Sequence, residues 1–150
     1  MPDALSWQAV QAVATRLAQI TVANGYRTNA GNSVLTEQLQ ADPGRGAVER
    51  LSVYLDRAAR APSTLFEGED WTLQLVVEAD VPSTLADAQQ RAHAVMADVF
   101  DLFPSGGIEL PIAGGFVDVE AQTAEFLTRV DGSNASVAQI RLQAIVRLSS

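Results

Sequence analysis

The strongest constraint on this 150-residue chain is an alternation of apolar and polar residues close to its C-terminus. Between 136 and 148 glutamine or arginine separates most of the apolar residues, which are Ala138, Ile140, Leu142, Ala144, Val146 and Leu148. Because successive side chains of a strand point to opposite faces of a sheet, this pattern predicts a strand buried on one face. Such strands are typical of antiparallel sheets, whose apolar face needs a covering layer.

Four earlier segments show the same period of two residues. The clearest is a strand predicted over 48–57, where leucine and valine alternate with polar residues. The turn sequence at 42–46 predicts a hairpin between this strand and the one before it, or two strands joined by a mobile loop, and the sequence at 131–134 predicts a hairpin turn. The other predicted strands cover 34–40, 71–80 and 116–131, the last with a bulge near Gln122.

Two segments have the spacing of an amphipathic helix. The first covers 4–24 and ends at an Asn-Gly pair, which is typical of a left-handed helix stop. The second covers 85–103 and carries the broadest apolar stripe of the sequence. Thr84 and Asp87 have the spacing of a capping box before it, and Pro104 ends it.

The elements follow the order α-β-β-β-α-β-β. This order predicts an α+β fold, a mostly antiparallel sheet of about five strands with two helices packed on one face. A chain of this length is expected to form one domain, so 1–150 is treated as a single unit. Segments without a regular period predict mobile loops near 41–47, 57–70 and 104–115.

The composition excludes several classes of protein. The chain has no cysteine and no lysine, which excludes disulfides, cysteine-ligated zinc, lysine Schiff bases and a Walker lysine. No apolar run is long enough to span a membrane, and the first residues lack the basic region of a signal peptide. The net charge of −8 argues against a protein that grips nucleic-acid phosphates. We therefore expect a soluble, intracellular, acidic domain.

The charge is unevenly distributed along the chain. Residues 1–64 carry six arginines against five acidic residues, whereas residues 65–150 carry four arginines against thirteen. Four arginines gather in and around the second predicted strand: Arg45, Arg50, Arg57 and Arg60. We interpret these arginines as candidates for contacts between copies of the chain, since opposite charges on two surfaces favour head-to-tail association. A DNA-phosphate patch and plain solvation are the alternatives. The acidic candidates for such contacts are Glu67, Glu69 and Asp70.

No pattern of residues predicts catalysis. His93 is the only histidine, so a catalytic triad or a two-histidine metal site cannot be built around it alone. Asp118 and Glu120 share one face of a strand, where a solvated surface or the wall of an acidic channel is favoured over a catalytic pair. Asp98 and Asp101 lie three residues apart late in the second helix, and we expect both to be exposed, whether or not an arginine pairs with them. We expect no enzyme, no metal and no cofactor.

One segment resembles a known family. The first helix runs into Ile-Thr-Val-Ala-Asn-Gly-Tyr-Arg-Thr-Asn-Ala-Gly at 20–31. This motif and the order of elements are similar to those of the tail terminator proteins of tailed bacteriophages and prophages, also called minor tail or tail completion proteins. The residues that match at motif level are Asn24, Gly25, Tyr26, Thr28 and Gly31. The resemblance implies that they stop the helix and redirect the chain into the sheet. Family members often carry a basic stretch after the motif, which 32–40 lacks.

The resemblance implies a function in virion assembly. Tail terminators form a ring, usually a hexamer, that caps the head-proximal end of the tail tube, ends its polymerisation and offers a surface to head-completion or connector proteins. A member would assemble in the host bacterial cytoplasm, contact the major tail tube protein and let DNA pass through its lumen. Asp118 and Glu120 are then candidates to face the lumen, because an acidic wall repels phosphates. The family sets no catalytic residues.

Two other functions stay open at this point. The chain is alternatively a head-tail joining or tube-like virion protein, or, with less support, a small α+β domain that binds a ligand or acts as an enzyme. The last alternative requires a buried pocket with converging polar groups.

Overall fold

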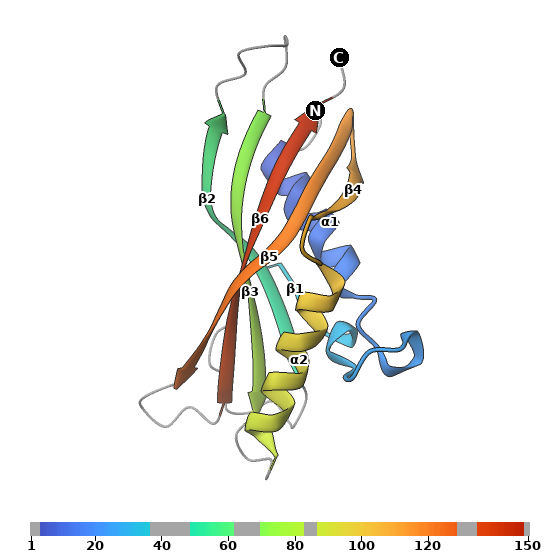
Figure 1. Ribbon diagram of the computed structural model, residues 1–150, viewed down its shortest axis with the longest axis vertical. Helices are drawn as coiled ribbons and strands as arrows, with labels where there is room; N and C mark the ends of the chain where they lie inside the picture. The colour runs from blue at the N-terminus through green and yellow to red at the C-terminus, as the bar shows by residue number, and fades with distance from the viewer. Residues whose placement is uncertain (1–3, 37–48, 62–69, 83–86, 129–134, 149–150) are drawn as a thin grey trace.

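The computed structural model describes residues 4–36, 49–61, 70–82, 87–128 and 135–148, which adopt an α+β architecture (Figure 1). Two α-helices, α1 (Leu5–Leu17) and α2 (Ala88–Leu102), pack with six strands. The strands are β1 (Val34–Leu35), β2 (Arg50–Ala61), β3 (Asp70–Pro82), β4 (Ile108–Ile112), β5 (Gly115–Thr128) and β6 (Ala135–Leu148). The predicted fold class is confirmed, and the details of the sheet differ.

The six strands form one sheet in the order β1-β2-β3-β6-β5-β4. Neighbouring strands run antiparallel, except that β1 runs parallel to β2 with Val34 beside Leu51. The sheet is therefore mixed and has one strand more than predicted. The parallel pair also makes the predicted hairpin between the first two strands wrong, because a hairpin turn joins antiparallel strands. β1 ends at Leu35, so Thr36 does not continue the predicted strand at 34–40. Residues 37–40 and the turn at 42–46 lie outside the described residues.

Both helices pack against the sheet face that the alternation of apolar residues predicts to be inward. Val13 and Leu17 of α1 and Val95 and Val99 of α2 are fully buried and share one core with the inward residues of the strands. The central strands contribute most of that layer, through Leu73, Leu75, Val77, Ala79, Ala138, Ile140, Leu142, Ala144 and Val146. Burial of each large aliphatic side chain contributes about 1.5–3 kcal/mol, so this shared layer holds the helices on the sheet.

The loop predicted near 104–115 is wrong, because this segment contains the edge strand β4. Ile108, Leu110 and Ile112 alternate toward the core side, and Gly114 turns the chain back into β5 with a φ of 80°. Pro111 hides this alternation in the sequence, since proline is usual only in edge strands such as this one. The loop predicted near 57–70 is also too long, since β2 continues to Ala61 and β3 begins at Asp70. The predicted loop at 41–47 lies outside the described residues.

The first helix ends seven residues earlier than predicted. After Leu17 the chain leaves the helical conformation, Thr21 is extended at φ −138° and ψ 153°, and a short 3₁₀ turn covers Val22–Asn24. The β-branched run at 20–22 explains this end, because such residues lose side-chain freedom in a helix. Gly25 is left-handed as predicted, with φ 92°, but it ends the 3₁₀ turn.

The second helix begins later than the predicted capping box requires. Asp87 is the N-cap residue of α2 and makes no side-chain capping bond, so it does not occupy the third helical position that the box assigns to it. Thr84 lies outside the described residues. The end of the helix before Pro104 agrees with the prediction, and so does the bulge of β5, where the register shifts between Ala121 and Thr123.

Candidate functional site

The motif at 20–31 folds into a compact connection between α1 and the sheet. The Thr21 hydroxyl accepts a hydrogen bond from the Asn24 backbone N–H at 3.3 Å, and the Asn29 side chain accepts one from Val22 N–H at 2.8 Å. The Asn24 side chain donates to the Gln19 carbonyl at 2.9 Å. These local bonds satisfy backbone groups that a helix end leaves open. The motif therefore stops the helix and redirects the chain, as the family resemblance implies.

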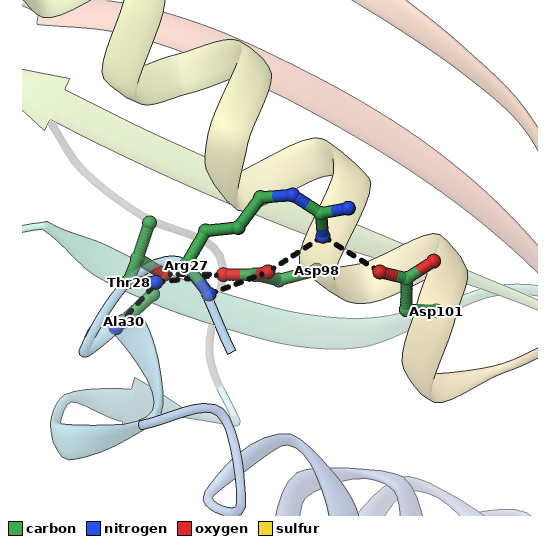
Figure 2. Close-up of polar contacts among 5 residues, drawn as sticks. All are labelled: Arg27, Thr28, Ala30, Asp98 and Asp101. Carbon is green, nitrogen blue, oxygen red and sulfur yellow. Dashed lines mark hydrogen bonds and ion pairs between the residues drawn. The ribbon is translucent and has the colours of Figure 1, made fainter. Parts of the chain in front are cut away.

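The same segment is joined to α2 by one buried carboxylate, Asp98 (Figure 2). Its Oδ1 accepts hydrogen bonds from Arg27 N–H at 3.0 Å and from Arg27 Nη1 at 3.1 Å. Its Oδ2 accepts bonds from the backbone N–H of Thr28 at 3.0 Å and from the Thr28 hydroxyl at 2.8 Å. Asp98 is fully buried, so the expectation that it is exposed is wrong. The physical reason is that all its solvent contacts are replaced by these four bonds.

Arg27 extends this contact along the surface of α2. Its Nη1 also donates to Asp101 Oδ2 at 2.6 Å, and these two groups are both more than half exposed. The hydrogen bonds that Arg27 donates to Asp101 and to Asp98 raise the pKa of Arg27, so the guanidinium stays charged. An arginine partner for both carboxylates is therefore present, and Asp101 is exposed as expected. We call Arg27, Thr28, Asp98 and Asp101 the clamp.

Gly31 closes the connection against the end of α1. A Cβ placed on Gly31 would lie 2.6–2.8 Å from the backbone oxygens of Leu17, Ala18 and Ile20. The Gly31 N–H donates to the Ile20 carbonyl at 2.8 Å. Only glycine fits so close an approach of two backbones.

The clamp is suited to holding elements together rather than to chemistry. Both oxygens of Asp98 already accept two hydrogen bonds each, which leaves no carboxylate site for a proton, a metal or a substrate. The motif residues that the resemblance singles out thus have a structural task. The sequence motif pointed to the loop, whereas its partner on α2, about 70 residues further along the chain, carried no local signal.

The arginines proposed for contacts between copies differ in their surroundings. Arg50 donates to Asp80 at 2.6 Å in a largely buried ion pair within the subunit. The guanidinium of Arg60 lies over the ring of Trp71, 5.2 Å from its centroid. Arg57 is exposed on β2 and makes no hydrogen bond or ion pair with any described residue. Arg45, Glu67 and Glu69 lie outside the described residues, and Asp70 begins β3 opposite Ala61.

Asp118 and Glu120 lie on the outer face of β5, opposite the buried Val117 and Val119. Glu120 Oε2 accepts a hydrogen bond from Gly106 N–H at 3.2 Å. The Asp118 carboxylate fills the space in which a side chain on Gly107 would stand. Both carboxylates thus border the connection between α2 and β4, and both are partly exposed on the outer face.

Polar contacts that the sequence did not point to cross the outer face of the sheet. The Tyr54 hydroxyl donates to Glu78 Oε1 at 2.6 Å, and Gln139 donates to the same oxygen at 3.3 Å. Arg141 pairs with Asp56 at 3.0 Å. Burial, together with the hydrogen bond to Glu78, raises the pKa of Tyr54 to about 12.

We expect Tyr54 to make stability fall at high pH. A pKa raised above the ordinary 10.0 contributes stability that is complete below pH 10.0 and is lost as the pH rises through about 12. The chain has no lysine, so no lysine ammonium loses its proton in this window and obscures the change. Urea unfolding at stepwise pH should show a steeper fall for wild type than for Tyr54→Phe. Equal pH slopes for the two proteins would contradict the assignment.

His93 lies exposed on α2, and its ring packs against the exposed Phe126 of β5 at a centroid distance of 4.5 Å. No described helix is long and apolar enough to cross a membrane.

Comparison with known proteins identifies the fold. The sequence matches no family profile and no curated protein. A chain from the virion of a native gene transfer agent particle has a similar structure, with a TM-score of 0.67 and 19% identity over 97% of this chain and 99% of that one. A second solved chain, without a descriptive name, has a TM-score of 0.53 and 18% identity over 95% and 97%. The chain therefore has, over nearly its whole length, a fold that is also found in a virion component.

Proposed function

We propose that this chain is a structural virion protein that caps a phage-type tail tube as a ring, ends tube polymerisation and forms the surface for head attachment. The observation that carries the proposal is the match of fold along 97% of the chain to a component of a gene transfer agent virion. That match also covers 99% of the virion chain, so the shared fold is not a small part of either chain. The proposed place is the head-proximal end of the tail.

The site geometry supports an architectural role over a catalytic one. The motif of the family resemblance is occupied in holding α1, the sheet and α2 together, and the buried Asp98 has no free acceptor site. A subunit that repeats in a ring needs its elements in fixed positions, because the same contact recurs at every interface and its rotation must close the ring. We therefore propose that the protein is not an enzyme.

The proposed partners are other copies of the chain, the major tail tube protein and a head-completion or connector protein. A closed ring, expected to be a hexamer, requires two different contact surfaces on each subunit. DNA would pass through the lumen without specific binding. The acidic net charge of −8 supports this, because phosphates would be repelled from the wall.

Deleting the gene in a particle-producing strain tests the proposal. We expect unattached heads together with tails of irregular or excessive length, and restoration of whole particles by the wild-type gene. Labelled protein should appear in electron micrographs at the junction of tail and head. Label along the whole tail would instead identify a tube protein, and normal tail length with unattached heads would identify a joining protein.

A further inference from the structure

The side chains in the second half of β2 are exposed on both faces of the sheet. Every residue from Leu55 to Arg60 is exposed, whereas Leu51, Ser52 and Val53 in the first half of the same strand are buried. Within the described residues, β1 pairs with β2 only at Leu51 and Ser52, so no described strand flanks the second half on its outer side. We call the segment from Leu55 to Ala61 the open edge.

The open edge carries one charged side chain without a hydrogen bond or ion pair to any described residue. Asp56 is paired with Arg141, and Arg60 lies over Trp71. Arg57 has no hydrogen bond or ion pair with a described residue, and its pairing with Gln74 places it on the outer face of the sheet. An unpaired arginine beside a β-bulge makes a strand edge a poor template for neutral or basic strands and favours an acidic partner.

The opposite edge of the same sheet carries the complementary charge. Glu109 of β4 is directly opposite Asp118 of β5 on the outer face, and Glu120 follows two residues along. Like charges directly opposite in a sheet are destabilising. The nearest arginine of this face, Arg147, is exposed and makes no ion pair with them among the described residues. The subunit thus holds two carboxylates directly opposite each other, and a positive charge from another molecule would reduce the repulsion between them.

These two edges fit each other between copies. When the β2 edge of one copy lies beside the β4 edge of the next, the outer faces of the two sheets continue into one another. Arg57 and Glu109 then lie on the same face at the seam. Pro111 removes one backbone donor from β4, so charge rather than a long backbone ladder has to determine this contact.

We propose that the open edge of one subunit docks beside the β4 edge of a second copy, with Arg57 facing Glu109 and Asp118 on the shared outer face. The contact joins two different surfaces, so it repeats from copy to copy, and in the proposed ring its rotation closes after the last subunit. The inference rests on the proposed function, for which it names the subunit contact.

Cysteine cross-linking tests the contact, because the natural chain has no cysteine. Ala59 of β2 and Pro111 of β4 are exposed and lie on the outer face near the two charges. A variant with both Ala59→Cys and Pro111→Cys should oxidise to a ladder of dimers, trimers and larger species. Each single variant should stop at dimers, and Pro111→Cys combined with Gln90→Cys, exposed on α2, should give no ladder beyond dimers.

Charge reversal adds specificity to this test. Arg57→Glu in the double-cysteine chain should lower the ladder yield about tenfold, and adding Glu109→Arg should restore it. Both residues are exposed, so folding should be unchanged, which circular dichroism checks. Absence of a ladder, an equal ladder from the Gln90 control, or no response to Arg57→Glu would overturn the proposal.

The outcome is distinguishable from the fate of the proposed function. Particles that carry the chain at the tail-head junction, but show no 59–111 cross-link, would remove this contact and leave the function standing. A ladder from a purified protein that is not found at the tail-head junction of particles would leave this contact standing and remove the proposed function.

Discussion

Replacing Asp98 with alanine is expected to lower the free energy of unfolding by about 3–4 kcal/mol. The substitution removes the acceptor of four hydrogen bonds at a fully buried position. The Thr28 hydroxyl and the backbone N–H groups of Arg27 and Thr28 would lose their partner, and a buried donor without a partner costs more than the bond contributes. Urea unfolding should show the loss directly, with a fall in Tm of roughly 10 °C.

Two matched variants separate this effect from the loss of a surface charge. Asp101→Ala removes the exposed end of the same ion-pair network and should cost less than about 1 kcal/mol. Asp98→Asn keeps one acceptor oxygen and should fall between the two. If Asp98→Ala and Asp101→Ala had equal effects, Asp98 would be an ordinary surface carboxylate and the clamp would not hold α2.

The clamp also marks the limit of what the sequence could predict. The apolar stripe of α2 and the strand alternation follow from local periodicity, and both are correct because burial of one face determines them. The burial of Asp98 depends on a contact with Arg27 and Thr28, about 70 residues away, and no local period reports such a contact. The sequence therefore favoured solvent exposure for both Asp98 and Asp101.

The sheet edges were the other part that the sequence could not predict. β1 has two residues, too few for an alternation, and its parallel pairing with β2 depends on a backbone bond from Leu51 N–H to Ser33 O at 2.8 Å. In β4 the proline and the flanking glycines favour the prediction of a loop, because both residue types are typical of turns. Among the candidate site residues, Arg50 shows the same limit. Its side chain is largely buried because it pairs with Asp80 on the neighbouring strand. Partners across a sheet are not encoded in local spacing.

Gly31→Ala is expected to cost roughly 3 kcal/mol or more. The added Cβ would lie 2.6 Å from the Leu17 carbonyl oxygen and 2.7 Å from that of Ile20, and both are backbone atoms that cannot rotate away. The connection would have to move off the end of α1, which strains the clamp through the short segment between Thr28 and Gly31. The measurement is urea unfolding, supported by hydrogen exchange at the Gly31 and Thr28 amides, whose protection should fall.

Gly25→Ala is the matched control, because the same motif holds two glycines for different reasons. Gly25 has φ 92° and no atom within 4 Å of an added Cβ, so its substitution costs only the left-handed backbone, about 1–2 kcal/mol. Gly31 has no positive φ and is needed solely for space. A larger loss for Gly31 than for Gly25, with the exchange change confined to Gly31→Ala, would show that close packing of the connection on α1 positions the clamp. Equal losses would mean that the motif needs its glycines only for turning the chain, and the packing argument would fail.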